Sequence, residues 1–223
     1  MTADETSAAV LDLSPDELLT TTRSVRLRLD LTRPVERPLL EACLDIAQQA
    51  PTGGNQQGWS FVIVTDAEKR RALGGLYKQS WDVYLQEIAA RNSAETQAMP
   101  SRNVLRVYRS AQYLADHMGE VPVLVVPCIA GRTEGAGVGE QASHWGSILP
   151  AVWSFMLAAR ARGLGTCWTT LHLRHEREAA DLLGIPYDDV TQAALIPVAH
   201  TIGHDFRSGP RKPLESMVHW EQW

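Results

Sequence analysis

The amino-acid sequence predicts an α+β protein in which one sheet packs against helices within a single domain. Several segments repeat apolar residues at helical spacing, and short runs of β-branched and aromatic residues lie between them. The two kinds of segment alternate without a regular βαβ period, which is why we expect an α+β fold. With 223 residues, of which 44% are hydrophobic, the chain can bury a core without disulfides or a structural metal.

The first helix is expected to begin with the tetrapeptide Ser14-Pro15-Asp16-Glu17. It combines a capping-box pattern with proline at the first helical position and acidic residues in the first turn. Residues 1–13 carry two early acidic residues and no apolar run, so we expect a disordered N-terminal tail rather than a signal peptide. The single domain is then expected to cover residues 14–223.

The remaining elements follow from the same two periodicities. We expect helices over residues 39–47, 141–162 and 174–183 and from about residue 67, and strands over residues 59–65, 121–130, 166–170 and 190–202. The strand over 121–130 contains two prolines, which we expect near its ends or at a sheet edge. Residues 77–120 are less regular, and we interpret them as helices that leave the core.

The charge balance argues against polyanionic partners. Lys and Arg number 21 against 26 Asp and Glu, a net charge of −5, so we expect no broad cationic surface for nucleic acid or an anionic membrane. The longest apolar stretch, residues 148–159, is interrupted by Pro150 and is too short to span a bilayer.

The cysteines favour a cytoplasmic location. Cys43, Cys128 and Cys167 are odd in number, far apart and set in apolar stretches, and the sequence has no Cys-x-x-Cys pair. This usage is typical of reduced thiols in a core rather than of a secreted disulfide framework.

Several common catalytic motifs are missing from the sequence. The glycine-rich segment 135–139 lies between a strand and a helix, but Glu140 stands where a dinucleotide-binding fingerprint needs glycine and would repel a pyrophosphate. There is no P-loop, zinc-protease or nucleophile-elbow motif. His172 and His175 have no neighbouring carboxylate or thiolate cluster, so we assign no metal.

Three separated segments carry polar groups that suit a flat, phosphorylated ligand. Residues 21–26 flank a hydroxyl with two guanidinium groups, which are strong phosphate donors. Residues 50–59 combine glycines with amide side chains, and residues 163–170 join a helix to a strand through small and hydroxyl residues. Taken singly, each segment is also compatible with an ordinary helix end or turn.

Together and in this order, the segments resemble the FMN-dependent nitroreductase family, whose members are NAD(P)H nitroreductase-like flavoproteins. The resemblance spans about residues 15–220 and is weakest over 77–120. It rests on R-S-V-R at 23–26, P-V at 34–35, A-P-T-G-G-N-Q-Q-G-W at 50–59, A-A-R-A-R-G-L-G-T-C-W-T-T at 158–170, G-I-P at 184–186 and R-K-P-L at 211–214. The chain departs from the common family pattern at Thr22, Gly58 and Ser154.

The resemblance implies a three-layer fold, with a mostly antiparallel sheet between helices, and an intertwined homodimer with FMN at the subunit interface. It assigns the phosphate and the pyrimidine side of FMN to one subunit, a glycine-rich loop to the other, and two threonines to the side of the ring. The implied cofactor-binding residues are Arg23, Ser24, Arg26 and Arg211, then Pro51, Thr52, Gly53 and Asn55 of the other subunit, and finally Thr169 and Thr170.

The implied chemistry is hydride transfer from NADPH or NADH to the flavin N5, followed by reduction of a nitroaromatic, quinone or similar electron-poor molecule in a ping-pong cycle. Arg26 is our choice for the cation beside the N1–C2 edge, where negative charge develops on reduction. No catalytic side chain is required for hydride uptake. Enone reduction, dehalogenation, another flavin reaction, or flavin binding without turnover are the alternatives.

Aromatic residues suggest where the substrate and the partner lie. We expect residues 77–120 to cover the ring as a variable helical excursion, and the candidate substrate contacts are Tyr77, Trp81, Tyr108 and Tyr113. At the C-terminus, Trp220 and Trp223 need a surface to bury against, which is either the partner subunit or the body of the same chain.

Overall fold

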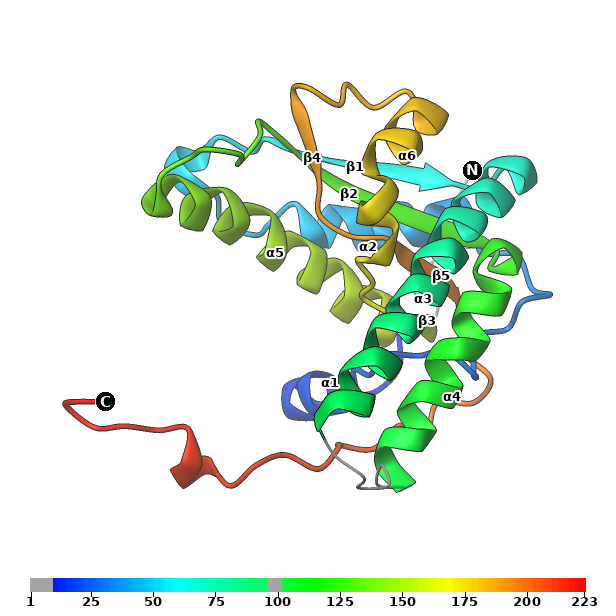
Figure 1. The fold of residues 1–223 in the computed structure, drawn as a ribbon, viewed down its shortest axis with the longest axis vertical. Coiled ribbons are helices and arrows are strands. Elements are labelled where there is room, and N and C mark those ends of the chain that lie inside the picture. The colour runs from blue at the N-terminus through cyan, green and yellow to red at the C-terminus, as the bar shows by residue number, and fades with distance from the viewer. Residues whose placement is uncertain (1–9, 96–101) are drawn as a thin grey trace, which may run out of the picture.

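A five-stranded antiparallel sheet forms the centre of the molecule (Figure 1). The computed structural model describes residues 10–95 and 102–223. The central strand is β2 (Val123–Ala130), and β1 (Trp59–Val64) pairs along one side of it. The other side of β2 pairs with β5 (Ile196–His200) and β4 (Val190–Gln192), and β3 (Leu164–Thr166) continues the sheet beyond β5.

The expected strand over residues 190–202 is two strands, and Pro127 explains the break. Pro127 lies inside β2, not at its end or at an edge as expected, and it has no N–H to donate to the ladder. Strand β5 pairs with β2 on one side of this proline and β4 pairs on the other. Between them the Ala193 N–H donates to the Pro127 carbonyl at 2.8 Å, so the chain bulges there without losing its bond to β2.

The expected strand over residues 166–170 is also displaced. Strand β3 ends at Thr166, and the chain beyond it meets the sheet only through an isolated bridge between Thr169 and Leu195. Residues 167–170 therefore form a connection whose backbone pairs with the sheet at Thr169 and not along a continuous ladder.

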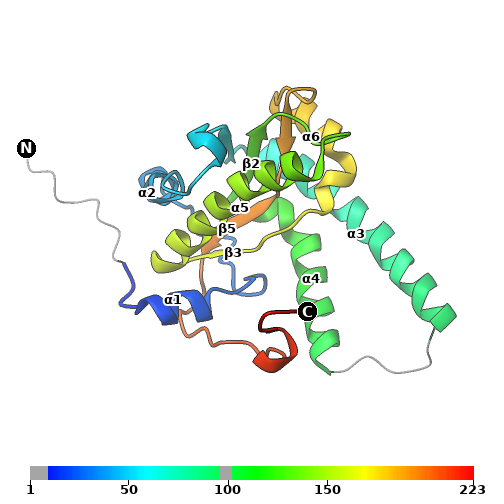
Figure 2. The same cartoon turned by 90° about the vertical axis from the view of Figure 1, so that its left-hand side faces the viewer.

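Helices cover both faces of the sheet, which confirms the three-layer expectation (Figure 2). Alternate residues of β2 enter opposite cores, as the pleat of a strand requires. One core packs Leu124, Val126 and Cys128 against helices α3 (Ala67–Glu95), α4 (Arg102–His117) and α6 (Glu176–Leu183). The other packs Val123, Val125 and Ile129 against α2 (Arg37–Ala47) and α5 (Val138–Ala161).

Helix α1 (Pro15–Thr21) begins where the sequence predicts. The Ser14 hydroxyl accepts from the Glu17 N–H, and the Glu17 carboxylate accepts from the Ser14 N–H, so both halves of the capping box are present. Residues 1–9 of the expected tail lie outside the described residues. Just before α1, the Leu11 N–H donates to the Ala161 carbonyl at 2.7 Å, so the chain is anchored to the end of α5 from there onward.

Of residues 77–120, those from 77 to 95 and from 102 to 120 are helical, and residues 96–101 of the expected excursion lie outside the described residues. Helix α3 begins at Ala67, after Asp66 accepts from the N–H groups of Glu68 and Lys69, and it continues without interruption through the core. Helices α3 and α4 diverge away from the sheet (Figure 2). The first half of α4 is therefore exposed, whereas Leu114 and Ala115 in its second half are buried.

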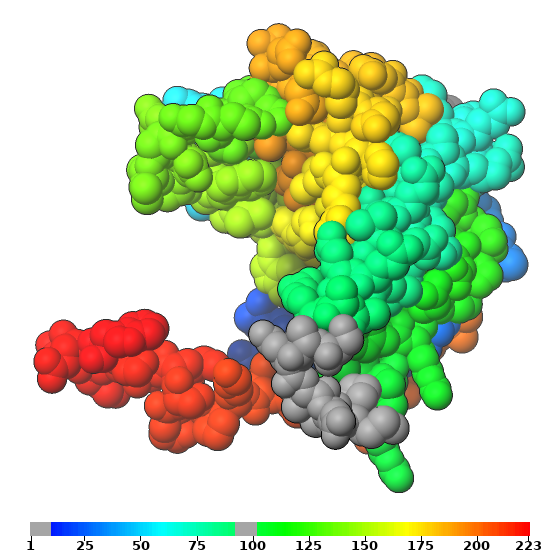
Figure 3. Space-filling model, in the orientation of Figure 1, coloured from blue at the N-terminus to red at the C-terminus, as the bar shows by residue number. Residues whose placement is uncertain are grey.

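The C-terminal segment extends away from the body of the molecule (Figures 1 and 3). Trp220 is 83% exposed and Trp223 is fully exposed, so neither docks on the body of its own chain. Their rings remain available for another surface. Within the described residues, no helix combines the length and the apolar composition that crossing a bilayer requires.

At Gly74, the backbone of α3 packs closely against the turn before β2. A Cβ placed on Gly74 would lie 2.5 Å from the Gly119 backbone nitrogen, whereas a Cβ on the adjacent Gly75 would have nothing within 4 Å. The backbones of α3 and of the turn before β2 therefore meet at Gly74. One and two turns further along α3, Tyr77 and Trp81 respectively enter the core.

We predict opposite effects for the two neighbouring glycine substitutions. Gly74→Ala should lower the free energy of unfolding by about 1 to 3 kcal/mol, because the new methyl group overlaps backbone that has no room to move. Gly75→Ala should raise it by about 0.5 to 1 kcal/mol, since alanine has the higher helix propensity and the site is open. Urea unfolding of both variants measures this, and equal effects would contradict the close contact.

Candidate functional site

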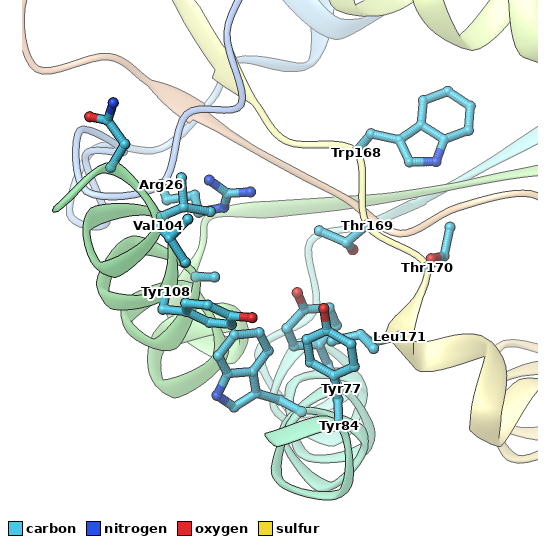
Figure 4. A pocket seen from close by; sticks show the side chains of 13 residues that line it. Arg26, Tyr77, Tyr84, Val104, Tyr108, Trp168, Thr169, Thr170 and Leu171 are labelled. Atoms are coloured by element: carbon cyan, nitrogen blue, oxygen red, sulfur yellow. The ribbon is translucent and has the colours of Figure 1, made fainter. Parts of the chain in front are cut away.

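Two adjoining cavities lie beside helix α4 and the connection after α1, and helix α3 lines the first of them. The first, which we call the aromatic cavity, has a volume of about 600 Å³ (Figure 4). Aromatic and apolar side chains form most of its wall. It is lined by Arg26, Tyr77, Trp81, Tyr84, Asn103, Val104, Val107, Tyr108, Ala111, Trp168, Thr169, Thr170 and Leu171.

The second cavity, which we call the cationic cavity, has a volume of about 540 Å³ and shares Arg26 and Val107 with the first. Arginines from three segments converge on it: Arg23, Arg26 and Arg28 from the connection after α1, Arg106 from α4, and Arg207 from the C-terminal segment. Of the described residues that line it, Asp205 is the one carboxylate, and it is paired with Arg28 at 2.6 Å.

The position of Arg26 follows from packing beside β3. The Val25 N–H donates to the Thr166 carbonyl at 2.8 Å, and Ser24 forms a bridge with the same residue. This approach requires Gly165, because a Cβ there would lie 2.9 Å from a side-chain carbon of Val25. With Val25 directed into the core, Arg26 faces the cavities and its Nη1 donates to the Ser110 hydroxyl at 3.4 Å.

Two titratable groups near Arg26, the Cys167 thiol and the Tyr77 phenol, stay neutral at neutral pH. Burial raises the pKa of the Cys167 thiol, and the neighbouring Arg26 only partly opposes this effect. Burial likewise raises the pKa of Tyr77, whose side chain is 4% exposed and lies beside the Thr169 hydroxyl. That hydroxyl donates to the Leu195 carbonyl at 2.5 Å, which fixes the threonine at the cavity wall. Among the described residues that line the aromatic cavity, Arg26 is therefore the one that carries a charge at neutral pH.

The structure brings together eight of the residues predicted from the sequence. Those at the two cavities are Arg23, Ser24, Arg26, Thr169, Thr170, Tyr77, Trp81 and Tyr108. Sequence reasoning did not assign Trp168, Arg106 or Arg207 to the site. Arg106 belongs to a detectable pattern, since Arg102, Arg106 and Arg109 share one side of a helix, but its position relative to the other arginines depends on the fold.

The glycine-rich loop lies away from both cavities in the folded chain. Residues 51–55 lie beside α5, where the Gly53 N–H donates to the Ser147 hydroxyl at 3.1 Å. A Cβ on Gly53 would lie 2.5 Å from the Ser143 hydroxyl oxygen, so a side chain at this position would require that hydroxyl to rotate away. Pro51 and Asn55 are exposed, and Asn55 has a φ of 53°, a conformation uncommon outside glycine. In a single chain these residues do not reach either cavity.

Two other predicted residues also lie away from the cavities. Arg211 is exposed in the C-terminal segment, where its Nη1 donates to the neighbouring Pro210 carbonyl. The Tyr113 ring packs against His117, with 4.4 Å between the ring centroids, and is not a lining residue. Tyr113 is therefore not among the side chains that line the aromatic cavity.

The sequence model of the nitroreductase family, described as "Nitroreductase family", matches residues 19–204. The chain belongs to the nitroreductase family. The matched region contains the Arg23–Arg26 segment, the glycine-rich loop and Thr169–Thr170, and it ends before Arg207, Arg211 and the terminal tryptophans.

Solved nitroreductase-fold structures share the fold of this family member. The FMN and NADPH-dependent nitroreductase NfnB from Sphigopyxis sp. strain HMH superposes with a TM-score of 0.65 at 23% identity, covering 95% of this chain and 100% of that one. An iodotyrosine deiodinase bound to FMN and 3-iodo-L-tyrosine gives a TM-score of 0.68 at 20% identity, covering 93% and 99%.

One protein that is similar in sequence is named for a third activity. The 5,6-dimethylbenzimidazole synthase of Rhodospirillum rubrum is 29% identical over 142 residues, which are 62% of this chain. The match spans 61% of the synthase, less than two thirds of its length. Family membership therefore defines the fold and the flavoprotein class, and the reaction has to be argued from the cavities.

Histidines do not form a metal site in the part of the chain that the structure describes. Within residues 10–95 and 102–223 there is no group of three or more His, Cys, Asp or Glu placed to hold a metal ion. His172, next to the cavity residue Leu171, is completely buried, and neither ring nitrogen has a hydrogen-bond partner within the described residues. Burial lowers the pKa of His172 to about 4.

We predict that His172 makes this nitroreductase-family protein sensitive to mild acid. The pKa of His172 in the folded chain lies below its unfolded value of 6.5, so folding favours the neutral imidazole. The free energy of unfolding therefore has its full value above pH 6.5 and decreases as the pH falls toward 4, because protonation favours the unfolded chain. The loss from this histidine should reach about 2 kcal/mol by about pH 5.

Urea unfolding at a series of pH values measures this loss. His172→Gln should remove it, whereas the control His175→Gln, on the same turn, should retain it. An acid slope that is equally steep in both variants would assign the loss to other groups.

Proposed function

We propose that this protein is an FMN-dependent oxidoreductase that takes hydride from NADPH or NADH and reduces nitroaromatic, quinone or similar electron-poor small molecules. The observation that carries the proposal is the pair of cavities, one aromatic and one cationic, that meet at Arg26. Both have volumes within the range of about 300 to 1,000 Å³ that is usual for small-molecule sites.

The residues present fit the two ends of FMN. A flat ring suits the aromatic cavity, where Trp168 and Tyr108 offer apolar surface and Thr169 and Thr170 offer hydroxyl groups. A phosphate suits the cationic cavity, where Arg23 and Ser24 supply charged and hydroxyl donors. We propose that these residues hold the cofactor, with Arg26 at the junction.

When bound, FMN supplies the redox chemistry, because its ring can accept a hydride equivalent from a reduced nicotinamide and pass it to a second small molecule. Arg26 places a permanent positive charge where negative charge increases on reduction. The buried side chains of Tyr77 and Trp81 add no charge to this wall, so Arg26 sets the sign of the local field. Donor and acceptor molecules would use the same cavity in turn, so we expect ping-pong kinetics.

We propose that a second copy of the chain completes the site and forms a homodimer with FMN at the interface. Pro51, Thr52, Gly53 and Asn55 would approach the partner's cofactor from an exposed loop. Helix α5 supports this arrangement, because it buries one side in the core and leaves Leu149 and Trp153, one turn apart, about 40% exposed.

Terminal segments support the same assembly. Trp220 and Trp223 do not bury against their own chain, and we propose that they cover the partner subunit. Arg211 directly follows Pro210, which lines the cationic cavity, and we propose that docking of the segment brings its guanidinium group toward the phosphate. Cys43, Cys128 and Cys167 are free and buried, which supports the reducing, cytoplasmic location that we propose.

The reaction is tested with the purified protein under anaerobic conditions. We expect a yellow protein whose visible absorbance is bleached by NADPH or NADH and restored by a nitroarene or a quinone. Steady-state rates with a nitroarene, a quinone, an enone and a halogenated phenol then rank the acceptor classes. A colourless protein that binds no FMN would overturn the proposal, and a flavin that neither nicotinamide bleaches would identify a binding protein without turnover.

We predict that Arg26→Ala weakens FMN binding by about tenfold to a hundredfold, because a charged hydrogen bond contributes about 1.5 to 3 kcal/mol. The midpoint potential of the bound flavin should fall as well, because the positive charge that stabilises the reduced state is gone. Arg33→Ala is the matched control, since Arg33 is exposed and pairs only weakly, at 3.9 Å, with Glu36. Unchanged FMN affinity and potential in Arg26→Ala would refute the role assigned to Arg26.

A further inference from the structure

The cationic cavity holds more positive charge than one cofactor phosphate neutralises. Five guanidinium groups line it, and its described carboxylate, Asp205, is already paired with Arg28. A phosphate monoester carries about two negative charges at neutral pH. Positive charge therefore remains after one phosphate has bound, in a chain whose net charge is −5.

The arginines of the cationic cavity differ in the contacts that their guanidinium groups make. Arg28 is engaged, because its Nε donates to the Ile202 carbonyl at 2.7 Å and its Nη2 binds Asp205. Arg26 donates to Ser110 at the junction of the cavities. Arg106 has no hydrogen-bond or ion-pair partner among the side chains that the structure describes. Once Arg23 is assigned to the cofactor phosphate, Arg106 remains available for another anion.

Helix α4 is electrostatically unfavourable without such an anion. Arg102, Arg106 and Arg109 lie in its first eight residues, and the sequence has no carboxylate from residue 102 to residue 115. Positive charge near the N-terminus of a helix opposes the helix dipole, and like charges four residues apart repel each other. A bound anion beside Arg106 would offset the repulsion between Arg106 and the arginines four residues before and three residues after it.

The position of α4 limits which molecule can supply this anion. Val107 lines both cavities, Tyr108 faces the aromatic one and Arg106 faces the cationic one. A molecule with a flat ring in the aromatic cavity can therefore extend across Val107 toward Arg106. A dinucleotide reductant has this form, with a flat nicotinamide at one end and a phosphorylated ribose at the other.

We propose that Arg106 binds the 2′-phosphate of NADPH, with Arg207 as the neighbouring cation, and so makes the protein select NADPH over NADH. This inference rests on the proposed function, because it takes the nicotinamide to be the hydride donor. An acceptor substrate with an anionic substituent is the other possible source of the charge that Arg106 recognises, and the test below separates the two.

Calorimetric titration of the FMN-loaded protein with 2′,5′-ADP and with 5′-AMP measures recognition of the 2′-phosphate without turnover. We expect wild type to bind 2′,5′-ADP about tenfold or more tightly than 5′-AMP, and Arg106→Ala to remove that difference. Arg109→Ala is the matched control, since it removes the same charge from the same helix outside the cavities and should retain the preference. Equal binding of both nucleotides by wild type, or equal losses in the two variants, would overturn the proposal.

A kinetic comparison separates the two sources of the anion. We expect Arg106→Ala to lower kcat/KM for NADPH about tenfold more than for NADH, with FMN content unchanged. A variant that instead raises KM only for a carboxylated nitroarene would assign Arg106 to the acceptor and overturn this inference. A wild-type protein that holds no FMN would overturn the proposed function, whereas an FMN-loaded protein with no 2′-phosphate preference would overturn this inference alone.

Discussion

The close packing of residues 24–29 against β3 is the contact on which the candidate site depends. It is possible because Gly165 has no side chain, so Val25 and Leu29 can enter the core directly beside the strand. The backbone bond from Val25 to Thr166 then sets the direction of the chain. One residue later Arg26 faces outward, at the only point where the aromatic and cationic cavities share a charged residue among those described.

In the proposed function, the two cavities bind different ends of one large, partly charged molecule. Aromatic and apolar side chains from α3, α4 and the 168–171 connection offer a surface on which a flat ring can stack. Guanidinium groups from three distant segments create a local positive field in a protein that is acidic as a whole. The net charge of the whole chain therefore does not predict the charge of the cationic cavity, which depends on the few arginines that line it.

Most of the fold could be predicted from local patterns, because its boundaries depend on local chemistry. The capping box at Ser14, the Asp66 cap and the glycine that ends α5 each act within one turn, and each element begins or ends where the sequence indicates. The break between β4 and β5 could not be predicted in this way. It depends on Pro127, which lies about 65 residues earlier in the chain and meets the break only after the sheet has formed.

The same distinction applies to the candidate site. Arg23, Arg26 and Thr169 were recognisable because they belong to continuous motifs, and the structure brings them to adjoining cavities. Arg106 was not, because its significance arises from the convergence of α4 on two remote loops. The glycine-rich loop shows the opposite limit, since its motif is clear but a single chain leaves it beside α5.

A crystal structure of the protein with FMN tests the central claim most directly. The account predicts two chains in which the ring lies in the aromatic cavity with its N1–C2 edge on Arg26, the phosphate contacts Arg23 and Ser24, and Asn55 of the other chain approaches the ring. A flavin bound away from both cavities, or held with Arg26 turned into solvent, would contradict it.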